Sequence, residues 1–553
     1  MTTATSARAP FARSWLDRLG GGAIVVFAAL IALPVLGVLL NVLSAPQSAE
    51  TLRHLATTVL PATVLDSLLL AVTVGIGAAA VGTACAWLTS VYTFPGRGVL
   101  SIALLLPLAM PAYVMAYAYT DLLQFAGPVQ SWLRDTFNLA PRGYWFPEVR
   151  SLPGAALMFI FVLYPYVYLL ARASFLERSQ TMLDAARTLG CTPWQAFVRV
   201  GMPLARPAVA AGAALAVMET LADYGTVAYF GVNTFTTAIY RAWFSLGDRA
   251  AAAQLASALL GFVALLVWCE AQSRGNARFY AVGQSIKGPS PKRLTGWRVA
   301  AAWAACMTPV VLGFVLPVVT LIALLARSDI SLDPRLLSWV RNSVVLAAST
   351  AALAAVLAVV LAHIARQRST PLQRAAMRIA ELGYAVPGAI IAVGILIPLA
   401  WFDNAIDAWA ERWLGVNLGL VFTGSAIALV YAYLVRFYAV SAQTIEAGYA
   451  KITPAMEHSA RSLGLRPWQV LRRVHVPLLA RSVAAATLLV FVDVMKELPA
   501  TLVIRPFDFD TLAVIANQFA ADERLAESAV PALAIVAAGI GPVALLARAM
   551  RRR

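Results

Sequence analysis

Two pairs of carboxylates lie inside apolar segments of the chain. Glu219 and Asp223 fall four residues apart in one such segment. Asp493 and Glu497 repeat this spacing 274 residues later, with Lys496 between them. An i, i+4 spacing places both members of a pair on one face of a helix. Ionisable groups in membrane spans usually face a cavity or a partner, so these residues indicate a polar path or an ion network within a membrane.

Two interpretations of these charges remain open. In the first, they form a buried ion network in which Lys496 neutralises Asp493 and Glu497, while arginines near the membrane surface satisfy the other carboxylates. In the second, the pairs line a central path and attract a hard cation, because carboxylate oxygens suit hard cations and the soft Cys and Met ligands are not clustered. The second interpretation predicts no fixed metal site but transient Fe³⁺ binding at Glu219, Asp223, Asp493 and Glu497.

The composition of the chain indicates a membrane protein. Its 553 residues are 60% hydrophobic and 13% charged, and the mean hydropathy is +0.75. Soluble domains average roughly 45–50% apolar and about 25% charged residues. The net charge of +16 would suit nucleic-acid binding if the cations formed a stripe on a soluble domain, but they lie in short loops between apolar runs. We therefore expect a lipid bilayer, and no nucleic acid, as a partner.

Twelve segments are long and apolar enough to cross a bilayer, since a spanning helix needs about 20 such residues. No small-residue cleavage site follows the first segment, so we expect it to be retained. Most Lys and Arg residues fall in loops on the side of the N-terminus, and the positive-inside rule then predicts that both termini are cytoplasmic. The predicted spans are residues 22–43, 65–89, 99–122, 152–172, 206–230, 250–270, 299–326, 342–365, 378–402, 418–440, 480–504 and 528–548.

The chain contains an internal duplication. Pro111 matches Pro387 at an offset of 276 residues, and Gly190 matches Gly464 at an offset of 274. Such ordered self-similarity indicates two copies of one structural unit. We expect an all-α membrane protein of two tandem six-helix units. Its predicted parts are an N-terminal tail at 1–20, a first domain at 21–273 with a repeated loop at 179–203, a basic linker at 274–298, and a second domain at 299–553 with the matching loop at 453–477.

Each repeated loop has the pattern of two short helices joined at a glycine. Gly190 and Gly464 stand where the first helix would end, because glycine accepts the left-handed conformation used at helix C-caps. Thr192 then caps a second helix that begins at Pro193, and a glutamine two residues later completes a capping-box pattern. The second copy has Arg466 at the cap position, so a weaker helix start is expected there.

The second helix of each loop presents an apolar face at spacings of three and four residues. This face could pack against the transmembrane helices of the chain itself or dock on a separate protein. The duplication of the loop favours docking on a repeated partner. The residues of the two faces are Trp194, Phe197 and Val198 in the first copy and Trp468, Leu471 and Val474 in the second.

These loops resemble the EAA loop of binding-protein-dependent ABC importer permeases, in which Glu-Ala-Ala is followed by a glycine and then by a hydrophobic-x-Leu-Pro sequence. The first copy carries Asp184, Ala185, Ala186, Gly190 and Pro203. The second copy carries His458, Ala460, Gly464 and Pro477, with histidine in place of the carboxylate. The resemblance, with the six-span unit around each loop, covers nearly the whole chain. It implies a transport subunit and not an enzyme.

The resemblance also implies that each loop is a coupling helix inserted into a cytoplasmic ATPase subunit. Two ATPase subunits and one periplasmic binding protein are then the expected partners. The chain has no G-x-x-x-x-G-K-[ST] phosphate loop, so ATP is used by the partner and no cofactor is expected in this chain. The residues expected to couple to the ATPase are Asp184, Ala185, Ala186, Gly190, Pro193, Trp194, Pro203, His458, Ala460, Gly464, Pro467, Trp468 and Pro477.

The segments from Met218 and Val492, with Arg505-Pro-Phe-Asp after the second, resemble the ferric iron branch of this family. This implies an iron(III) importer in the bacterial inner membrane, with the translocation path at Glu219, Asp223, Asp493, Lys496 and Glu497. Thiamine, polyamine, phosphonate and sulfate permeases share the EAA loop and remain alternatives. A major-facilitator secondary transporter would also have twelve spans in two halves, but it leaves the repeated Gly-x-x-Pro-Trp-Gln loops unexplained.

Overall fold

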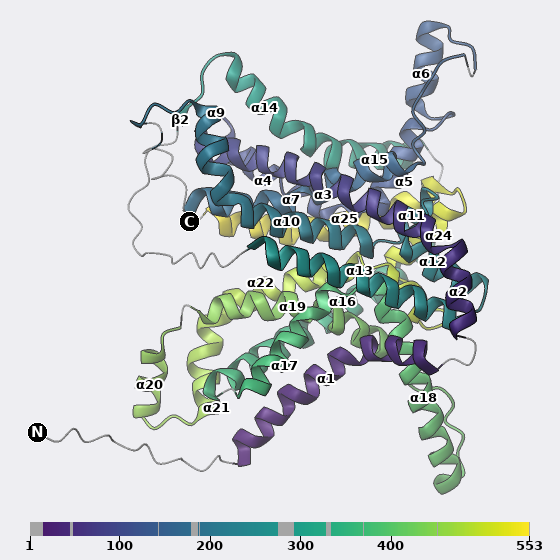
Figure 1. Ribbon diagram of the computed structural model, residues 1–553, viewed down its shortest axis with the longest axis vertical. Helices are drawn as coiled ribbons and strands as arrows, with labels where there is room; N and C mark the ends of the chain where they lie inside the picture. The colour runs from purple at the N-terminus through teal and green to yellow at the C-terminus, as the bar shows by residue number, and fades with distance from the viewer. Residues whose placement is uncertain are drawn as a thin grey trace, which may run out of the picture.

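The fold is all-α and is built from two helical halves. The computed structural model describes residues 15–44, 48–141, 143–177, 186, 188–274, 292–327, 333–368, 370–450 and 452–551. Within these residues the only strands are β1 (Tyr92–Thr93) and β2 (Lys292–Arg293), which pair in parallel. Figure 1 shows the long helices of both halves running side by side. The predicted fold class is therefore confirmed.

The first half is organised around three helices that pack closely on one another, α3, α7 and α10. Close approach is possible because Gly82 of α3 has no side chain: a Cβ there would lie 2.8 Å from the Tyr164 carbonyl oxygen of α7. The elements of this half are α1 (Trp15–Ser44), α2 (Ser48–Thr58), α3 (Leu60–Val91), α4 (Arg97–Ala103), η1 (Leu106–Ala109), α5 (Ala112–Leu123), α6 (Pro128–Phe137), α7 (Leu152–Glu177), α9 (Pro193–Ala196), η2 (Phe197–Gly201), α10 (Met202–Ala222), α11 (Gly225–Tyr229), α12 (Phe235–Tyr240), η3 (Arg241–Ser245) and α13 (Arg249–Arg274).

The second half repeats this arrangement with α16, α19 and α22 packed together. Its elements are α14 (Trp297–Val310), η4 (Val311–Val315), α15 (Leu316–Arg327), α16 (Leu336–Arg368), α17 (Pro371–Glu381), η5 (Leu382–Ala385), α18 (Gly388–Leu414), α19 (Ala426–Tyr449), α20 (Pro454–Ser462), α21 (Pro467–Val470), η6 (Leu471–His475), α22 (Val476–Met495), α23 (Pro499–Ile504), α24 (Leu512–Ala521) and α25 (Leu525–Arg551).

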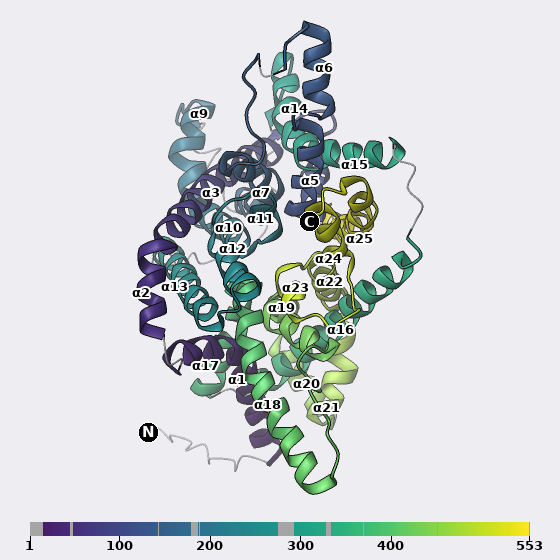
Figure 2. The ribbon, with the colours of Figure 1, turned by 90° about the vertical axis from the view of Figure 1, so that its right-hand side faces the viewer.

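The first long helix of each half lies against the other half. Helix α1 packs against α17 and α18, and α14 and α15 pack against α3 and α5 (Figure 2). At the first contact, a Cβ on Gly37 would lie 2.5 Å from the carbonyl oxygen of Gly394, so the two backbones nearly touch. At the second, Trp303 Nε1 donates to the Pro95 carbonyl at 2.9 Å. Because each half packs its first long helices against the other half, these contacts hold the two halves together.

Eleven helices in the described ranges are long and apolar enough to cross a membrane, and there are twelve if a bent pair counts as one span. The bent pair is the predicted third span: Arg97–Ala109 and Ala112–Phe137 meet at 93°. The bend falls at Pro111, where the chain is extended and a proline cannot continue the preceding helix. The predicted third span is therefore broken at Pro111, and the predicted total of twelve spans is reached when the bent pair counts as one.

Several predicted span boundaries also differ from the helices. The predicted ninth span began at residue 378, but α18 begins at Gly388, because Pro387 interrupts the helical backbone. The predicted tenth span began at residue 418, but α19 begins at Ala426. Three glycines with positive φ, at positions 415, 419 and 424, hold the preceding segment in a loop.

Candidate functional site

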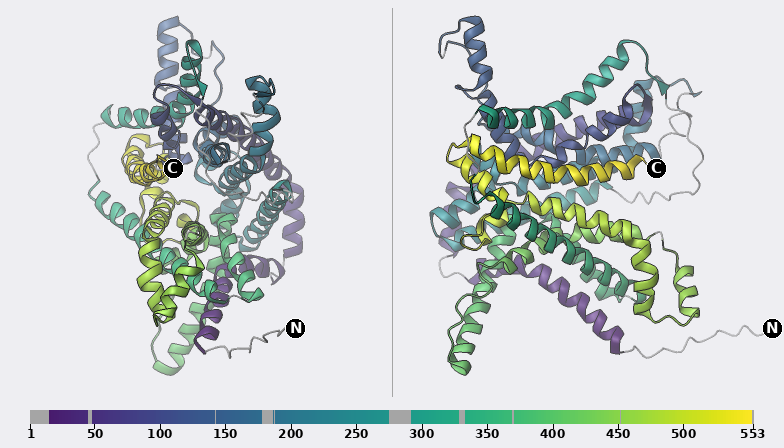
Figure 3. Two further views of the ribbon diagram at one scale, coloured as in Figure 1. Left: turned by 90° about the vertical axis from the view of Figure 1, so that its left-hand side faces the viewer. Right: turned by 180° about the vertical axis from the view of Figure 1, so that it is seen from behind.

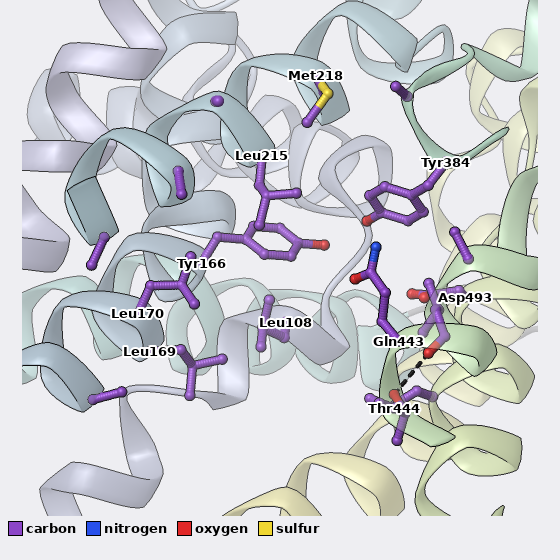
Figure 4. A pocket seen from close by; sticks show the side chains of 18 of the residues that line it. Leu108, Tyr166, Leu169, Leu170, Leu215, Met218, Tyr384, Gln443, Thr444 and Asp493 are labelled. Atoms are coloured by element: carbon purple, nitrogen blue, oxygen red, sulfur yellow. Dashed lines mark hydrogen bonds between the residues drawn. The ribbon is translucent and has the colours of Figure 1, made fainter. Parts of the chain in front are cut away.

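A cavity of about 940 Å³ lies between the two halves. Its walls come from α7 and α10 on one side and from α19 and α22 on the other, and most of the lining side chains are apolar. Figure 4 shows Leu169, Leu170 and Leu215 on the first-half wall and Asp493 on the opposite wall. The lining runs along α10 from Leu204 to Met218, a length of about 21 Å at 1.5 Å per residue. The cavity thus extends from the end of α10 that follows the first repeated loop (179–203) into the interior.

Charged and phenolic groups gather at the inner end of the cavity. Tyr166 and Tyr384 come from opposite halves, and their hydroxyl groups point toward one another in Figure 4. A smaller cavity of about 90 Å³ adjoins this end and shares Tyr166, Asp493 and Lys496 with the large one. The residues around the small cavity include the whole predicted path: Glu219, Asp223, Asp493, Lys496 and Glu497. The structure therefore brings the predicted path residues of both halves together.

Arg436 of α19 links the carboxylates across the two halves. Its Nη1 atom lies 3.3 Å from Glu497 Oε1, and its Nη2 atom lies 3.7 Å from Glu219 Oε2. Glu219 also accepts a hydrogen bond of 2.7 Å from the Tyr384 hydroxyl. Since Arg436 is only 7% exposed, it is the buried counter-charge of this cluster. We name Glu219, Asp223, Arg436, Asp493, Lys496 and Glu497 the charged cluster.

The predicted ion network is correct for one pair and wrong for another. Lys496 Nζ lies 2.9 Å from Asp493 Oδ1, as expected. Glu497, however, is paired with Arg436 and not with Lys496. The sequence already contained the signal for Arg436, because this residue lies within the predicted tenth span and an intramembrane cation normally has a function or a partner.

The prediction that each carboxylate pair shares one helical face is wrong. Helix α10 ends at Ala222, and the Asp223 carboxylate accepts hydrogen bonds from the backbone and hydroxyl of Thr226 at 2.9 and 3.1 Å. Helix α22 ends at Met495. The second carboxylate of each pair therefore serves the start of the next short helix, α11 or α23, instead of extending the first helix.

Glu497 makes the equivalent contacts at the start of α23. It accepts from the backbone N–H groups of Ala500 and Thr501 at 3.0 and 3.2 Å and from the Thr501 hydroxyl at 2.7 Å. Acidic residues are favoured at helix starts, a signal at Asp223 and Glu497 that the sequence interpretation did not use. Among the described residues, no three His, Cys, Asp or Glu side chains gather to hold a metal ion. Transient Fe³⁺ binding thus stays a prediction.

The two repeated loops, 179–203 and 453–477, are called the coupling loops after their predicted role, and they share their backbone geometry. Gly190 and Gly464 have φ values of +84° and +83°, the left-handed conformation that glycine accepts most readily. Pro193 and Pro467 are the first residues of α9 and α21. Pro203 and Pro477 lie in the first turn of α10 and α22, which continue from the loops into the membrane. Asp184 and Ala185 lie outside the described residues, as do residues 179–183 and 187 of the first predicted loop and residues 275–291 of the linker.

The helix starts in the two loops differ as the sequence suggests. In the first, Thr192 Oγ1 accepts from the Gln195 N–H at 3.3 Å, and Gln195 Oε1 accepts from the Thr192 N–H at 3.0 Å. In the second, Gln469 Oε1 accepts from the Arg466 N–H at 2.8 Å. The arginine side chain has no acceptor atom, so the reciprocal bond cannot form.

The apolar face of each loop is divided between the chain and the exterior. Phe197 packs against Trp87 with ring centroids 4.9 Å apart, and Leu471 is buried. Trp194 and Trp468 are 71% and 64% exposed. Packing against the chain itself is therefore confirmed for Phe197 and Leu471. Docking of the two exposed tryptophans on a partner stays a prediction.

A partly buried ion pair holds the second coupling loop. Glu457 Oε1 lies 2.7 Å from Arg366 Nε and 3.3 Å from His475 Nε2. The neighbouring His458 is exposed, whereas Ala186 and Ala460 are buried at equivalent positions of the two loops. The alignment of the two copies places the carboxylate position at His458, but the carboxylate that contacts the transmembrane helices is that of Glu457, one residue earlier.

Comparison with known proteins identifies the family. Residues 71–269 and 354–553 match the family described as "Binding-protein-dependent transport system inner membrane component". The Fe(3+)-transport system permease protein FbpB 2 of Haemophilus influenzae is 26% identical over 489 residues, which cover 87% of this chain and 88% of the relative.

Two relatives with other names match shorter stretches. The sulfate transport system permease protein CysT of Escherichia coli is 31% identical over 152 residues, 28% of this chain and 52% of the relative. The molybdenum transport system permease protein ModB of Escherichia coli is 29% identical over 202 residues, 35% of this chain and 85% of the relative. With two matched domains, each holding one coupling loop and one carboxylate pair, this chain belongs to the binding-protein-dependent transport inner membrane components, as a fused two-domain ABC importer permease.

Proposed function

We propose that this permease moves ferric iron, delivered by a periplasmic binding protein, across the bacterial inner membrane. The observation that carries the proposal is the charged cluster at the inner end of the cavity. It has four carboxylates against two cations, Arg436 and Lys496, so it is net negative when all six groups are ionised. A negative cluster attracts a cation and repels an oxyanion. The similarity to an Fe(3+) permease over most of both chains supports the same assignment.

The cavity dimensions suit an ion that keeps part of its ligand shell. A volume of 940 Å³ would hold about 30 water molecules at roughly 30 Å³ each. The mostly apolar walls offer few groups that would retain the ion; the carboxylates in the lining are Glu381 and Asp493, of which Asp493 belongs to the charged cluster. The ion would thus meet the carboxylates first on entry from the periplasm and then leave through the wide cavity.

ATP used by two partner ATPase subunits would supply the energy for this movement, and the coupling loops would transmit it. One ATPase subunit would bind each loop through Trp194 or Trp468, with both loops and both termini on the cytoplasmic side. Gly190 and Gly464 would set the angle between the two short helices of each loop. Closure of two ATPase subunits on ATP would then pull both loops together and turn the halves outward. In this arrangement one copy of the chain serves two ATPase subunits and one binding protein.

Sulfate is the second candidate cargo, because the sulfate permease CysT matches part of the chain. An oxyanion path would need donors such as Lys496 to be free, whereas this lysine is paired with Asp493.

The two cargoes are separated by uptake into cells that lack this permease, with and without its re-expression. Labelled ferric iron, sulfate, molybdate, thiamine and putrescine are each supplied alone. Re-expression should restore uptake of iron and leave the other four unchanged. Restored uptake of sulfate or molybdate without iron would remove the iron assignment and leave the importer family intact.

A further inference from the structure

Two amphipathic arms leave the helical body at the end of the spans opposite the coupling loops. The first is α6, and the second is the distal part of α18, residues 401–414. In Figure 1 both arms lie at the right edge and extend away from each other, while α9, α20 and α21 lie at the left. The view from behind in Figure 3 shows the same arrangement. The arms run across the direction of the long helices and away from the central cavity.

One face of the α18 arm is covered by the loop that returns from it. Asp403 accepts hydrogen bonds from the N–H groups of Phe422 and Thr423 at 2.9 and 2.6 Å. Asp407, one turn later, accepts from Leu418 and Gly419 at 2.7 and 2.9 Å. The acidic face of the arm is thus satisfied by the loop backbone and is not available to a partner.

The opposite face of this arm is aromatic. Trp401, Trp409 and Trp413 are 75%, 57% and 71% exposed. At 100° per residue, their mean direction is about 150° from that of Asp403 and Asp407. Three exposed tryptophans on one side of a helix form a large apolar surface.

The α6 arm is built in the same way. Gln130 donates to the Leu123 carbonyl at 2.8 Å and accepts from the Tyr144 hydroxyl at 2.8 Å. Arg134, one turn later, donates to the Phe125 carbonyl at 2.8 Å and to Tyr144 at 3.1 Å. Trp132, on the other side of the helix, is 59% exposed. In each arm, polar residues four positions apart therefore form hydrogen bonds with the loop that returns from the arm, and tryptophan lies on the opposite face of the helix.

We propose that the two arms lie in the membrane–water interface and bind the lipid surface through their tryptophans. Tryptophan is enriched at this interface, and helices with one apolar face lie in its plane. The lipid-facing surface of the spans continues into the α18 arm: α1 contacts α18 at Gly37 and Gly394, and the neighbouring Leu36 and Leu40 are exposed. A binding protein that delivers cargo to the central cavity would need surfaces near that cavity, whereas the arms extend away from it.

The arms are continuous with segments that border the charged cluster. A Cβ on Gly388, the first residue of α18, would lie 2.8 Å from Glu497 Oε1 and 2.7 Å from Arg436 Nη1. Lipid contact at the far end of α18 would therefore hold in place a helix whose near end touches the cluster. This role is independent of the cargo.

The first test compares two spin labels on the same arm in lipid nanodiscs. Ala405→Cys lies on the aromatic face and Glu411→Cys lies away from it, and both native residues are exposed. The labels are placed in the full chain after its four cysteines are replaced by serine. The Ala405 label should collide more with oxygen than with a water-soluble nickel chelate, and the Glu411 label should show the reverse. Equal access of the nickel chelate to both labels would overturn the proposal.

The second test keeps the native cysteines. Lipids brominated near the headgroup end of the acyl chain should quench the tryptophan fluorescence of the wild type more than that of the triple variant Trp401→Phe, Trp409→Phe, Trp413→Phe. Trp194→Phe, in a coupling loop, is the matched control and should not lower the quenched fraction. An unchanged fraction in the triple variant would contradict the proposal. So would shielding of the Ala405 label only after the binding protein is added, because the arm would then be a protein docking surface.

Discussion

Replacement of Arg436 by methionine should destabilise the protein by leaving buried carboxylates without their counter-charge. Removal of one partner from a buried ion pair costs about 3–5 kcal/mol. Glu497 is 4% exposed, but it keeps hydrogen bonds from Ala500 and Thr501. Glu219 keeps its bond from Tyr384. These remaining bonds compensate part of the lost charge, so we expect the lower end of the range, about 3 kcal/mol.

A double variant separates charge from packing. Arg436→Met with Glu497→Gln removes both members of the closer pair, and it should recover about 1–3 kcal/mol relative to Arg436→Met alone, as coupled neighbours do. The free energy of unfolding is measured by titrating the purified protein with SDS in mixed micelles. Arg374→Met, at an exposed position of α17, is the control and should change stability by less than about 0.5 kcal/mol. A loss below about 1 kcal/mol in Arg436→Met, or a double variant no more stable than the single, would refute the reasoning.

Three further predictions concern the loops and the start of α11. The double variant Gly190→Val, Gly464→Val forces β-branched residues into the left-handed region, which costs about 1–2 kcal/mol at each position. Cargo uptake should therefore fall while the amount of protein in the membrane is unchanged. Normal uptake would contradict the coupling role. Trp194→Ala with Trp468→Ala should weaken co-purification of the ATPase subunit with little change in stability, because both side chains are exposed; undiminished co-purification would exclude them as contacts. Asp223→Ala should lower the free energy of unfolding by about 0.5–2 kcal/mol. Asp223→Asn should lower it less, because asparagine can still accept the hydrogen bonds from the α11 backbone. Equal losses in both variants would show that these hydrogen bonds do not cause the loss of stability.

Hydropathy and the internal repeat were sufficient to predict the fold class, the two halves and the two loops in which short helices meet at a glycine. The exchange of α1 and α14 between halves could not be predicted, because it depends on close backbone contacts such as Gly37 against Gly394, which leave no periodic pattern. The break at Pro111 and the loop before Ala426 had local signals in proline and glycine. Those signals were outweighed by the apolar composition around them.

The sequence predicted most residues of the charged cluster but not the directions of their side chains. The carboxylates and Lys496 were found because charge in an apolar segment is conspicuous. Arg436 and Tyr384 were missed, although Arg436 had the same signal. Because the helices end at Ala222 and Met495, Asp223 and Glu497 do not share a helical face with the first carboxylate of their pair. A helical face can be assigned only when the helix continues through both residues of a pair.

Uptake of radiolabelled ferric iron with the charged cluster neutralised is the most direct test of the central claim. Cells that lack the permease are complemented with wild type or with the variant Glu219→Gln, Asp493→Asn, and the amount of each protein in the membrane is measured in parallel. The claim predicts that wild type restores iron uptake and that the variant, present in equal amount, loses at least about tenfold in rate, the effect of about 1.4 kcal/mol on the barrier. Equal iron uptake by both proteins would contradict the claim that the charged cluster conducts the ion.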